Sequence, residues 1–152
     1  MIKTTIAVGL AALALSGCMT AAQQADEDRR FHAAENALNI AQERATVTCE
    51  GELVCEKAWR LTKAYVAANS DMQVRAADDT MVDTYAPSNS GMVSLRAMRA
   101  DTATGATITL TGVCRNMYSD STGKEMGGAY SACFSRLGEL WNGFGPFLKE
   151  RL

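Results

Sequence analysis

The sequence has only one histidine, two prolines and 7% aromatic residues, and neither sign of charge dominates it. The 15 basic and 17 acidic side chains give a formal net charge of −2, so there is no electrostatic footprint for nucleic acid. A single histidine, His32, excludes a two-histidine metal site and leaves little for a histidine-based triad. With 47% hydrophobic and 21% charged residues, the 152-residue chain is neither a disordered tail nor a collagen-like fibre nor a polytopic membrane protein.

The first eighteen residues contain one uncharged apolar run. A cation, Lys3, precedes the run from Ile6 to Leu15, and small residues with Cys18 follow it. This order is typical of a secretory signal peptide. The run has about half of the roughly 20 residues that a membrane-spanning helix needs, so we expect residues 1–17 to be a cleaved signal peptide.

The end of this run, Leu15-Ser16-Gly17-Cys18, resembles the lipobox of bacterial prolipoproteins. The resemblance implies cleavage before Cys18, lipidation of its sulfur and acylation of the new amine. Two or three acyl chains form a stable membrane anchor, because each buried CH₂ contributes about 0.8 kcal/mol. Met19 follows in place of the aspartate that, in Gram-negative members of the family, favours inner-membrane retention. The resemblance therefore implies a lipid-anchored protein of the cell envelope, in the outer membrane and facing the periplasm.

Four cysteines remain after Cys18, namely Cys49, Cys55, Cys114 and Cys133. An even number in an exported chain predicts disulfide bonds. Four cysteines allow three pairings, and we favour Cys49–Cys55 with Cys114–Cys133 because each pair closes a short loop. Free buried thiols are an alternative. A zinc site is disfavoured because neither spacing matches the close pairs that zinc ligands form.

Apolar residues recur at helical spacing in three parts of the mature chain. The pattern predicts helices over residues 26–45, 52–69 and 129–142. The third helix is expected to end at the helix-breaking residues that follow it, which are Gly143, Gly145 and Pro146.

Between the second and third predicted helices, the apolar period changes from that of a helix to two. Extended segments are expected over residues 72–76, 80–85, 92–99 and 106–115, with a turn or bulge at Asp78-Asp79. The element order predicts an α+β fold, in which a small antiparallel sheet of three to four strands has helices packed on one face.

The chain divides into three expected parts. Residues 1–17 are the signal peptide, residues 18–47 a lipid-anchored tether with the N-terminal helix, and residues 48–152 a disulfide-stabilised α+β domain. A domain of about 105 residues buries nearly two-thirds of its unfolded surface, so two disulfides add stability to a small core.

The domain also resembles a set of uncharacterised proteobacterial envelope lipoproteins over about 70 residues. The shared residues are Cys49, Cys55, Trp59, Asn69-Ser70, Thr84-Tyr85-Ala86-Pro87 and Cys114-Arg115-Asn116. The resemblance supports the domain limits and implies no activity, because none is assigned to that set.

Three carboxylates, Asp78, Asp79 and Asp83, are the one cluster that resembles an acid–base or cation site. On a strand, Asp79 and Asp83 share a face that Asp78 opposes, so at most two of them converge. A charged strand edge that opposes aggregation is the alternative. The sequence therefore predicts no catalytic residue, no metal site and no cofactor.

Four aromatic residues are candidates for a binding surface, although core packing is the favoured interpretation for the two tryptophans. They are Trp59, Tyr65, Tyr85 and Trp141.

Three functions are compatible with these features. The first is a non-catalytic binding or scaffolding lipoprotein, with the membrane as one partner and an envelope protein or the cell wall as the other. The second is a cell-wall-acting enzyme or accessory that uses Asp78, Asp79 and Asp83. The third is an inhibitor of a host hydrolase. The small lipoproteins of that class are mainly β, so the two strong helices predicted here argue against this function.

Overall fold

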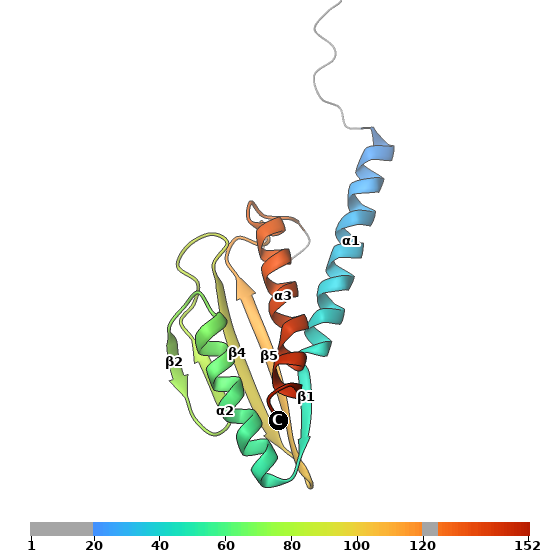
Figure 1. Ribbon diagram of the computed structural model, residues 1–152. Helices are drawn as coiled ribbons and strands as arrows, with labels where there is room; N and C mark the ends of the chain where they lie inside the picture. The colour runs from blue at the N-terminus through green and yellow to red at the C-terminus, as the bar shows by residue number, and fades with distance from the viewer. Residues whose placement is uncertain (1–19, 120–124) are drawn as a thin grey trace, which may run out of the picture.

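The computed structural model describes residues 20–119 and 125–152, so the predicted leader and Cys18 lie outside the described residues. The described chain is an α+β fold with a five-stranded antiparallel sheet (Figure 1). In chain order the elements are α1 (Ala21–Arg44), β1 (Thr46–Glu50), α2 (Glu52–Asn69), β2 (Val74–Ala77), β3 (Met81–Thr84), β4 (Val93–Asp101), β5 (Gly105–Cys114) and α3 (Tyr130–Lys149).

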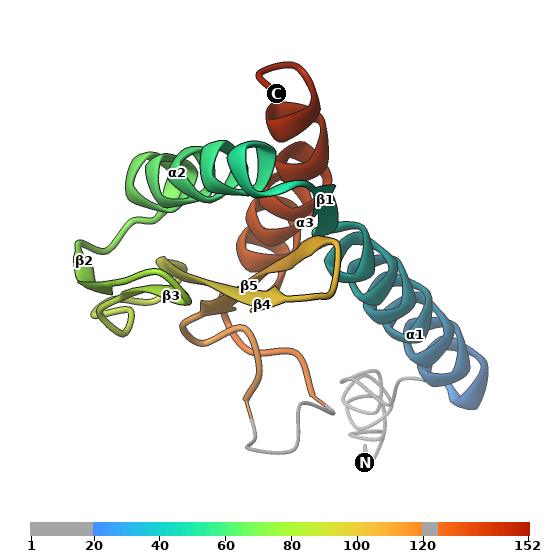
Figure 2. The same ribbon diagram turned by 90° about the horizontal axis from the view of Figure 1, so that it is seen from below.

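The strands follow the order β1-β5-β4-β3-β2, with β4 and β5 as the long central hairpin. Helices α2 and α3 lie on the same face of the sheet, whereas α1 projects past its β1 edge (Figure 2). The core lies between the sheet and these two helices. Its largest fully buried side chains include Trp59 from α2, Phe144 from α3 and Ile108 from β5.

The sheet has one strand more than the three to four expected, and the additional strand is β1. It pairs with β5 from Thr46↔Thr109 to Glu50↔Gly105. This segment was missed because Thr46-Val47-Thr48-Cys49-Glu50 is short, mostly polar and enclosed by two helices. Only its pairing with β5, more than fifty residues away, makes it a strand.

Helix α3 continues through the residues that were expected to end it. Phe144 and Leu148 are fully buried on its inner face, and a Cβ atom added at Gly145 would lie 3.7 Å from the carbonyl oxygen of Arg44. Pro146 removes one helical hydrogen bond, close to the C-terminal end of the helix. Burial of the two large side chains offsets that loss.

Helix α1 begins at Ala21, five residues before the predicted start, and Thr20 caps it. The hydroxyl of Thr20 accepts from the Gln23 amide, and the Gln23 side chain accepts from the Thr20 amide in return. The buried residues of α1, Leu38 and Ala41, lie in its C-terminal half. Phe31 packs partly buried against Tyr130, and the main neighbour of the helix is α3.

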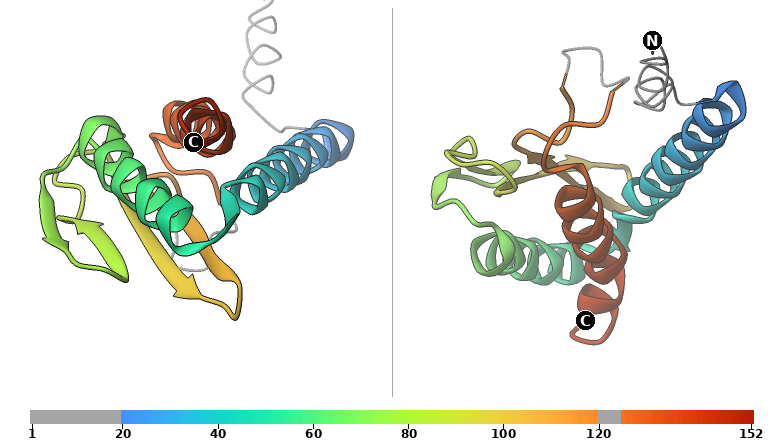
Figure 3. Two further views of the ribbon diagram at one scale, coloured as in Figure 1. Left: turned by 60° about the horizontal axis from the view of Figure 1, so that its bottom comes forward. Right: turned by 90° about the horizontal axis from the view of Figure 1, so that it is seen from above.

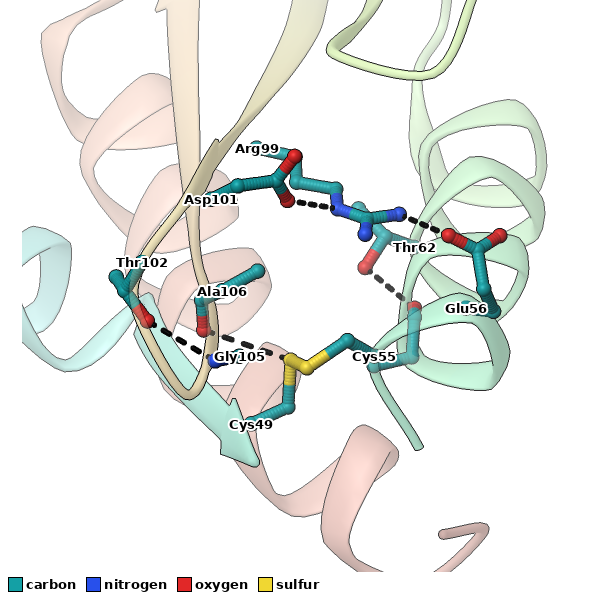
Figure 4. The surroundings of a disulfide bond; sticks show 10 residues. Cys49, Cys55, Glu56, Thr62, Arg99, Asp101, Thr102, Gly105 and Ala106 are labelled. Carbon is teal, nitrogen blue, oxygen red and sulfur yellow. Dashed lines mark hydrogen bonds and ion pairs between the residues drawn. A yellow bond between two sulfur atoms is a disulfide. The ribbon is translucent and has the colours of Figure 1, made fainter. Parts of the chain in front are cut away.

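Two disulfides, Cys49–Cys55 and Cys114–Cys133, join the cysteine pairs favoured from the sequence. The first connects β1 to the first turn of α2, and the second connects the end of β5 to α3. Beside the first, the Arg99 guanidinium donates to Glu56 of α2 at 2.6 Å and to Asp101 of β4 at 2.9 Å (Figure 4). The Glu56 and Asp101 carboxylates raise the pKa of Arg99, because they favour its charged form.

Candidate functional site

The face of the sheet opposite α2 and α3 is not covered by any helix of the described chain (Figures 2 and 3). Strand side chains alternate between the two faces. On β4, Val93, Leu95 and Ala97 are buried under the helices, so Ser94, Arg96 and Met98 lie on the open face. Threonines supply most of the rest of this face, namely Thr46, Thr48, Thr107, Thr109 and Thr111. The open face is therefore mainly hydroxylated, with Met98 and Val113 as its exposed apolar side chains.

A groove of about 530 Å³ lies on this open face. Residues of the neighbouring strands β2, β3, β4 and β5 line it. Its lining residues are Arg75, Asp83, Thr84, Tyr85, Ala86, Ser94, Leu95, Arg96, Thr111, Gly112 and Val113. The only charged groups among them are the two guanidinium groups and the Asp83 carboxylate, so the groove carries a net charge of about +1 at neutral pH.

Asp83 lies between the two arginines. Register places Asp83 of β3 directly opposite Arg96 of β4, and the Arg96 Nε and Nη2 atoms donate to its two oxygens at 3.2 and 3.0 Å. Arg75 donates from the other side to the same carboxylate. Arg75 reaches it because the β2–β3 register shifts between Val74 and Ala76, which makes Arg75 the extra residue of a β-bulge.

The Asp83 carboxylate is ionised and almost enclosed, with 8% of its side chain exposed. The hydrogen bond from Arg96, followed by the bond from Arg75, holds the pKa of Asp83 below its usual value, against the opposing effect of burial. About half of each guanidinium-bearing side chain remains exposed. Asp83 therefore orients two arginines that still present N–H groups to the groove.

The three carboxylates predicted as a cluster, Asp78, Asp79 and Asp83, lie in three different environments. The Asp78 carboxylate is used inside the β2–β3 turn, where it accepts from the amides of Thr80 at 2.7 Å and Met81 at 2.8 Å. These backbone hydrogen bonds lower the pKa of Asp78. Asp79 lies exposed in the same turn, and Asp83 is engaged by arginines. Within residues 20–119 and 125–152, no group of three or more His, Cys, Asp or Glu side chains could hold a metal ion.

Of the four aromatic residues expected to form a binding surface, only Tyr85 is exposed, and it lines the groove. A binding role at the surface was wrong for Trp59, Tyr65 and Trp141, which are at most 6% exposed, and the core packing favoured for the two tryptophans is confirmed. The indole N–H of Trp59 donates to the Asp78 carbonyl, and the Tyr65 hydroxyl donates to the Leu140 carbonyl. These three side chains pack inside because they occupy the inner faces of α2 and α3.

Sequence reasoning missed Arg75 and Arg96 as site residues. Arg96 alternates with buried residues on β4, which is the normal pattern for a solvated position on a half-buried strand. Its pairing with Asp83 depends on the β3–β4 register, which no local pattern encodes. No signal in the sequence indicates the bulge that directs Arg75.

A second, smaller groove of about 250 Å³ lies between α1, the end of β5 and α3. Glu35 of α1 accepts hydrogen bonds there from the hydroxyls of Tyr118 at 2.8 Å and Tyr130 at 2.6 Å. Burial and the Glu35 carboxylate raise the pKa of Tyr118 to about 12. Trp141 also lines this groove, and its buried indole nitrogen has no hydrogen-bond partner among the described residues.

No protein-family model matches this chain, and comparison with curated proteins and with solved structures gave no match either. Among the helices that the structure describes, none combines the length and the apolar character required to cross a bilayer.

Proposed function

We infer that this chain is an envelope lipoprotein, anchored by acyl groups on Cys18, whose folded domain binds a periplasmic partner without chemical turnover. The anchor is supported by the lipobox resemblance of residues 15–18. The two disulfides of the domain are typical of exported proteins. Met19, in place of the aspartate that favours inner-membrane retention in the lipoprotein family, supports an outer-membrane location, and we place the domain in the periplasm.

The observation that carries the binding role is the open face of the sheet with its groove. A sheet of an α+β domain commonly presents one face to solvent, and this face is not merely solvated. It combines exposed Met98 and Val113 with an arginine-lined concavity. Concave surfaces with a few convergent polar groups are the usual places where proteins bind ligands.

The anchor is tested by labelling cells with a palmitate analogue that carries a clickable group. We expect the wild-type protein to become labelled and to fractionate with the outer membrane. The Cys18→Ala variant should remain unlabelled and keep its leader. Label on Cys18→Ala, or an unlabelled wild-type protein that lacks the leader, would contradict the lipoprotein assignment.

The binding role is tested by photo-crosslinking in intact cells with the acylated protein. A photoreactive residue is placed at Met98 or Val113 on the open face and, as matched controls, at Ala64 or Ala67 on the exposed side of α2. We expect discrete adducts from positions 98 and 113 and none from positions 64 and 67. Adducts of equal yield from both sides, or none from the open face, would rule out this face as the binding surface.

A further inference from the structure

We propose that the groove on the open face binds the carboxylate of an acidic sugar, held between Arg75 and Arg96. This inference rests on the proposed function and names the ligand class for the same site. The ligand is a short segment of a glycan that contains uronic acid, with one carboxylate at the arginines and its sugar ring against the adjoining side chains.

The charge of the groove favours a single negative charge on the ligand. Two guanidinium groups share one buried carboxylate, so one positive charge is uncompensated among the residues that line the groove. Arg96 directs Nε and Nη2 to Asp83, and Arg75 directs Nη2. The remaining N–H groups include those on the Nη1 atoms of both arginines and on Nε of Arg75, and these three nitrogens have no partner in the described part of the chain. A carboxylate accepts from such paired donors at two oxygens.

Asp83 preorganises the site, because it holds the side chains of both arginines in place. Its carboxylate is nearly buried and fixed on β3, and it draws both guanidinium groups to one place. Holding the two side chains in this position reduces the conformational entropy that binding would otherwise remove. Asp83 is therefore a positioning residue, and the arginines are the residues that contact the ligand.

The rest of the groove matches a sugar better than a peptide. A peptide that binds by strand addition needs the free backbone edge of a strand. This groove lies on the face of the sheet, where the backbone groups of β3, β4 and β5 are directed to neighbouring strands. The face supplies side-chain hydroxyls from Ser94 and Thr111 and the exposed ring of Tyr85. Side-chain hydroxyls can form hydrogen bonds with the hydroxyl groups of a sugar, and an aromatic ring can pack against the C–H face of a sugar ring.

The size of the groove fits this class of ligand. Its volume of about 530 Å³ lies in the range of roughly 300–1,000 Å³ that small-molecule sites occupy. The second groove, near Glu35 and Trp141, is about 250 Å³ and already holds a carboxylate against two phenols. It therefore offers no comparable place for an anionic ligand.

The test is a calorimetric titration of the acylated mature protein in detergent micelles with matched probes. Cellobiouronate carries one carboxylate, and cellobiose is the same disaccharide with a neutral CH₂OH in its place. We expect saturable binding of cellobiouronate, no measurable binding of cellobiose, and weaker binding as the salt concentration rises. No binding of cellobiouronate, or equal binding of both sugars, would overturn the proposal.

Two further probes separate the sources of negative charge. N-acetyl-dialanine presents a carboxylate on a peptide, and glucose 6-phosphate presents a phosphate on a sugar. The proposal expects both to bind at least about tenfold more weakly than cellobiouronate, because each lacks one of the two matched features. Tighter binding of the peptide or of the phosphate would assign the groove to that chemistry and overturn the sugar carboxylate.

Variants locate the binding to the groove. Arg75→Ala and Arg96→Ala should each weaken cellobiouronate binding by about tenfold or more, since each removes charge-assisted hydrogen bonds. Tyr85→Ala should weaken it too, and we expect this variant to fold because the Tyr85 side chain is exposed. Arg60→Ala on the exposed side of α2 is the matched control and should bind as wild type does. Equal effects of Arg60→Ala and Arg96→Ala would overturn the proposal.

Failure of the ligand assignment can be distinguished from failure of the proposed binding role. If positions 98 and 113 give specific adducts in cells while cellobiouronate does not bind, the open face is a binding surface and the ligand class is wrong. If those positions give no adducts, the binding role of the face itself fails.

Discussion

Arg96 and Asp83 lie directly opposite each other on adjacent strands and meet through two parallel hydrogen bonds, Nε to Oδ1 at 3.2 Å and Nη2 to Oδ2 at 3.0 Å. Opposite charges at paired strand positions stabilise a sheet. Here the Asp83 carboxylate also holds the Arg96 guanidinium in the wall of a groove. Arg75 contacts the same carboxylate and adds a second positive charge. Structural stability and the charge of the groove therefore depend on one acidic residue.

Replacing Asp83 with asparagine should lower the free energy of unfolding at neutral pH by about 1–3 kcal/mol, since the charged hydrogen bonds are lost. The pKa of Asp83 is depressed in the folded state, so its contribution is present above the unfolded value near 3.8 and is lost as the pH falls through the folded value. Urea unfolding of both proteins between neutral pH and about pH 3 measures this. The difference between wild type and Asp83→Asn should shrink below about pH 4, and a difference independent of pH would contradict the assignment.

The Glu35 carboxylate should be visible in the ionisation of Tyr118. Burial, and then the hydrogen bond and charge of Glu35, raise the pKa of Tyr118 from 10.0 to about 12. The raised pKa means that Tyr118 contributes its full stabilisation of the folded state below the pKa of tyrosine in the unfolded chain. This contribution is lost as the pH rises through the pKa of Tyr118 in the folded state. Glu35→Gln should move the tyrosinate absorbance transition of Tyr118 downwards but leave it above 10.0, because burial is the larger cause. Glu139→Gln, on an exposed position of α3, is the control and should leave the titration unchanged.

Removing a disulfide should lower the free energy of unfolding, and the loss should be larger for the disulfide that closes the longer loop. Cys114 and Cys133 are separated by 19 residues, and their joint replacement by alanine should lower the free energy of unfolding by about 3 kcal/mol. For Cys49 and Cys55, separated by 6 residues, the corresponding loss is about 2 kcal/mol. Denaturant unfolding of the two double variants gives both values. The reverse order would show that native-state packing, rather than the entropy of the unfolded chain, determines the effect.

The β1–β5 pairing should be sensitive to one methyl group. A Cβ atom added at Gly105 would lie 2.0 Å from the carbonyl oxygen of Cys49, a backbone atom that cannot move aside alone. Gly105→Ala should therefore destabilise the protein by about 3 kcal/mol or more. Gly128→Ala is the matched control, since nothing lies within 4 Å of its added Cβ. Thermal unfolding of the two variants makes the comparison, and similar melting temperatures would refute the close approach.

Local patterns were sufficient for several parts of this fold. The α2 helix spans the residues that its helical period indicated, and the two disulfides join cysteines that are neighbours in sequence. Both features arise within a few turns of chain. The strand β1 and the end of α3 could not be obtained in this way, because the pairing of β1 with β5 and the burial of Phe144 and Leu148 depend on distant contacts.

The candidate site shows the same division. Tyr85 and Asp83 were identified from the sequence as residues of interest, and both line the groove. Arg75 and Arg96 were not, because one depends on a β-bulge and the other on strand register. Conversely, Trp59 and Trp141 were considered for binding and lie in the core.

The sequence by itself indicated the leader pattern, the bounds of α2, the alternation of β4 and β5 and the pairing of nearby cysteines, since each is encoded by residue type at short spacing. The tertiary structure alone decided which side of the sheet remains open and which charged groups meet on it. A periodic pattern states that a strand has an inner and an outer face, but only packing places particular outer side chains beside one another. The groove between Arg75 and Arg96 is therefore a property of the assembled sheet.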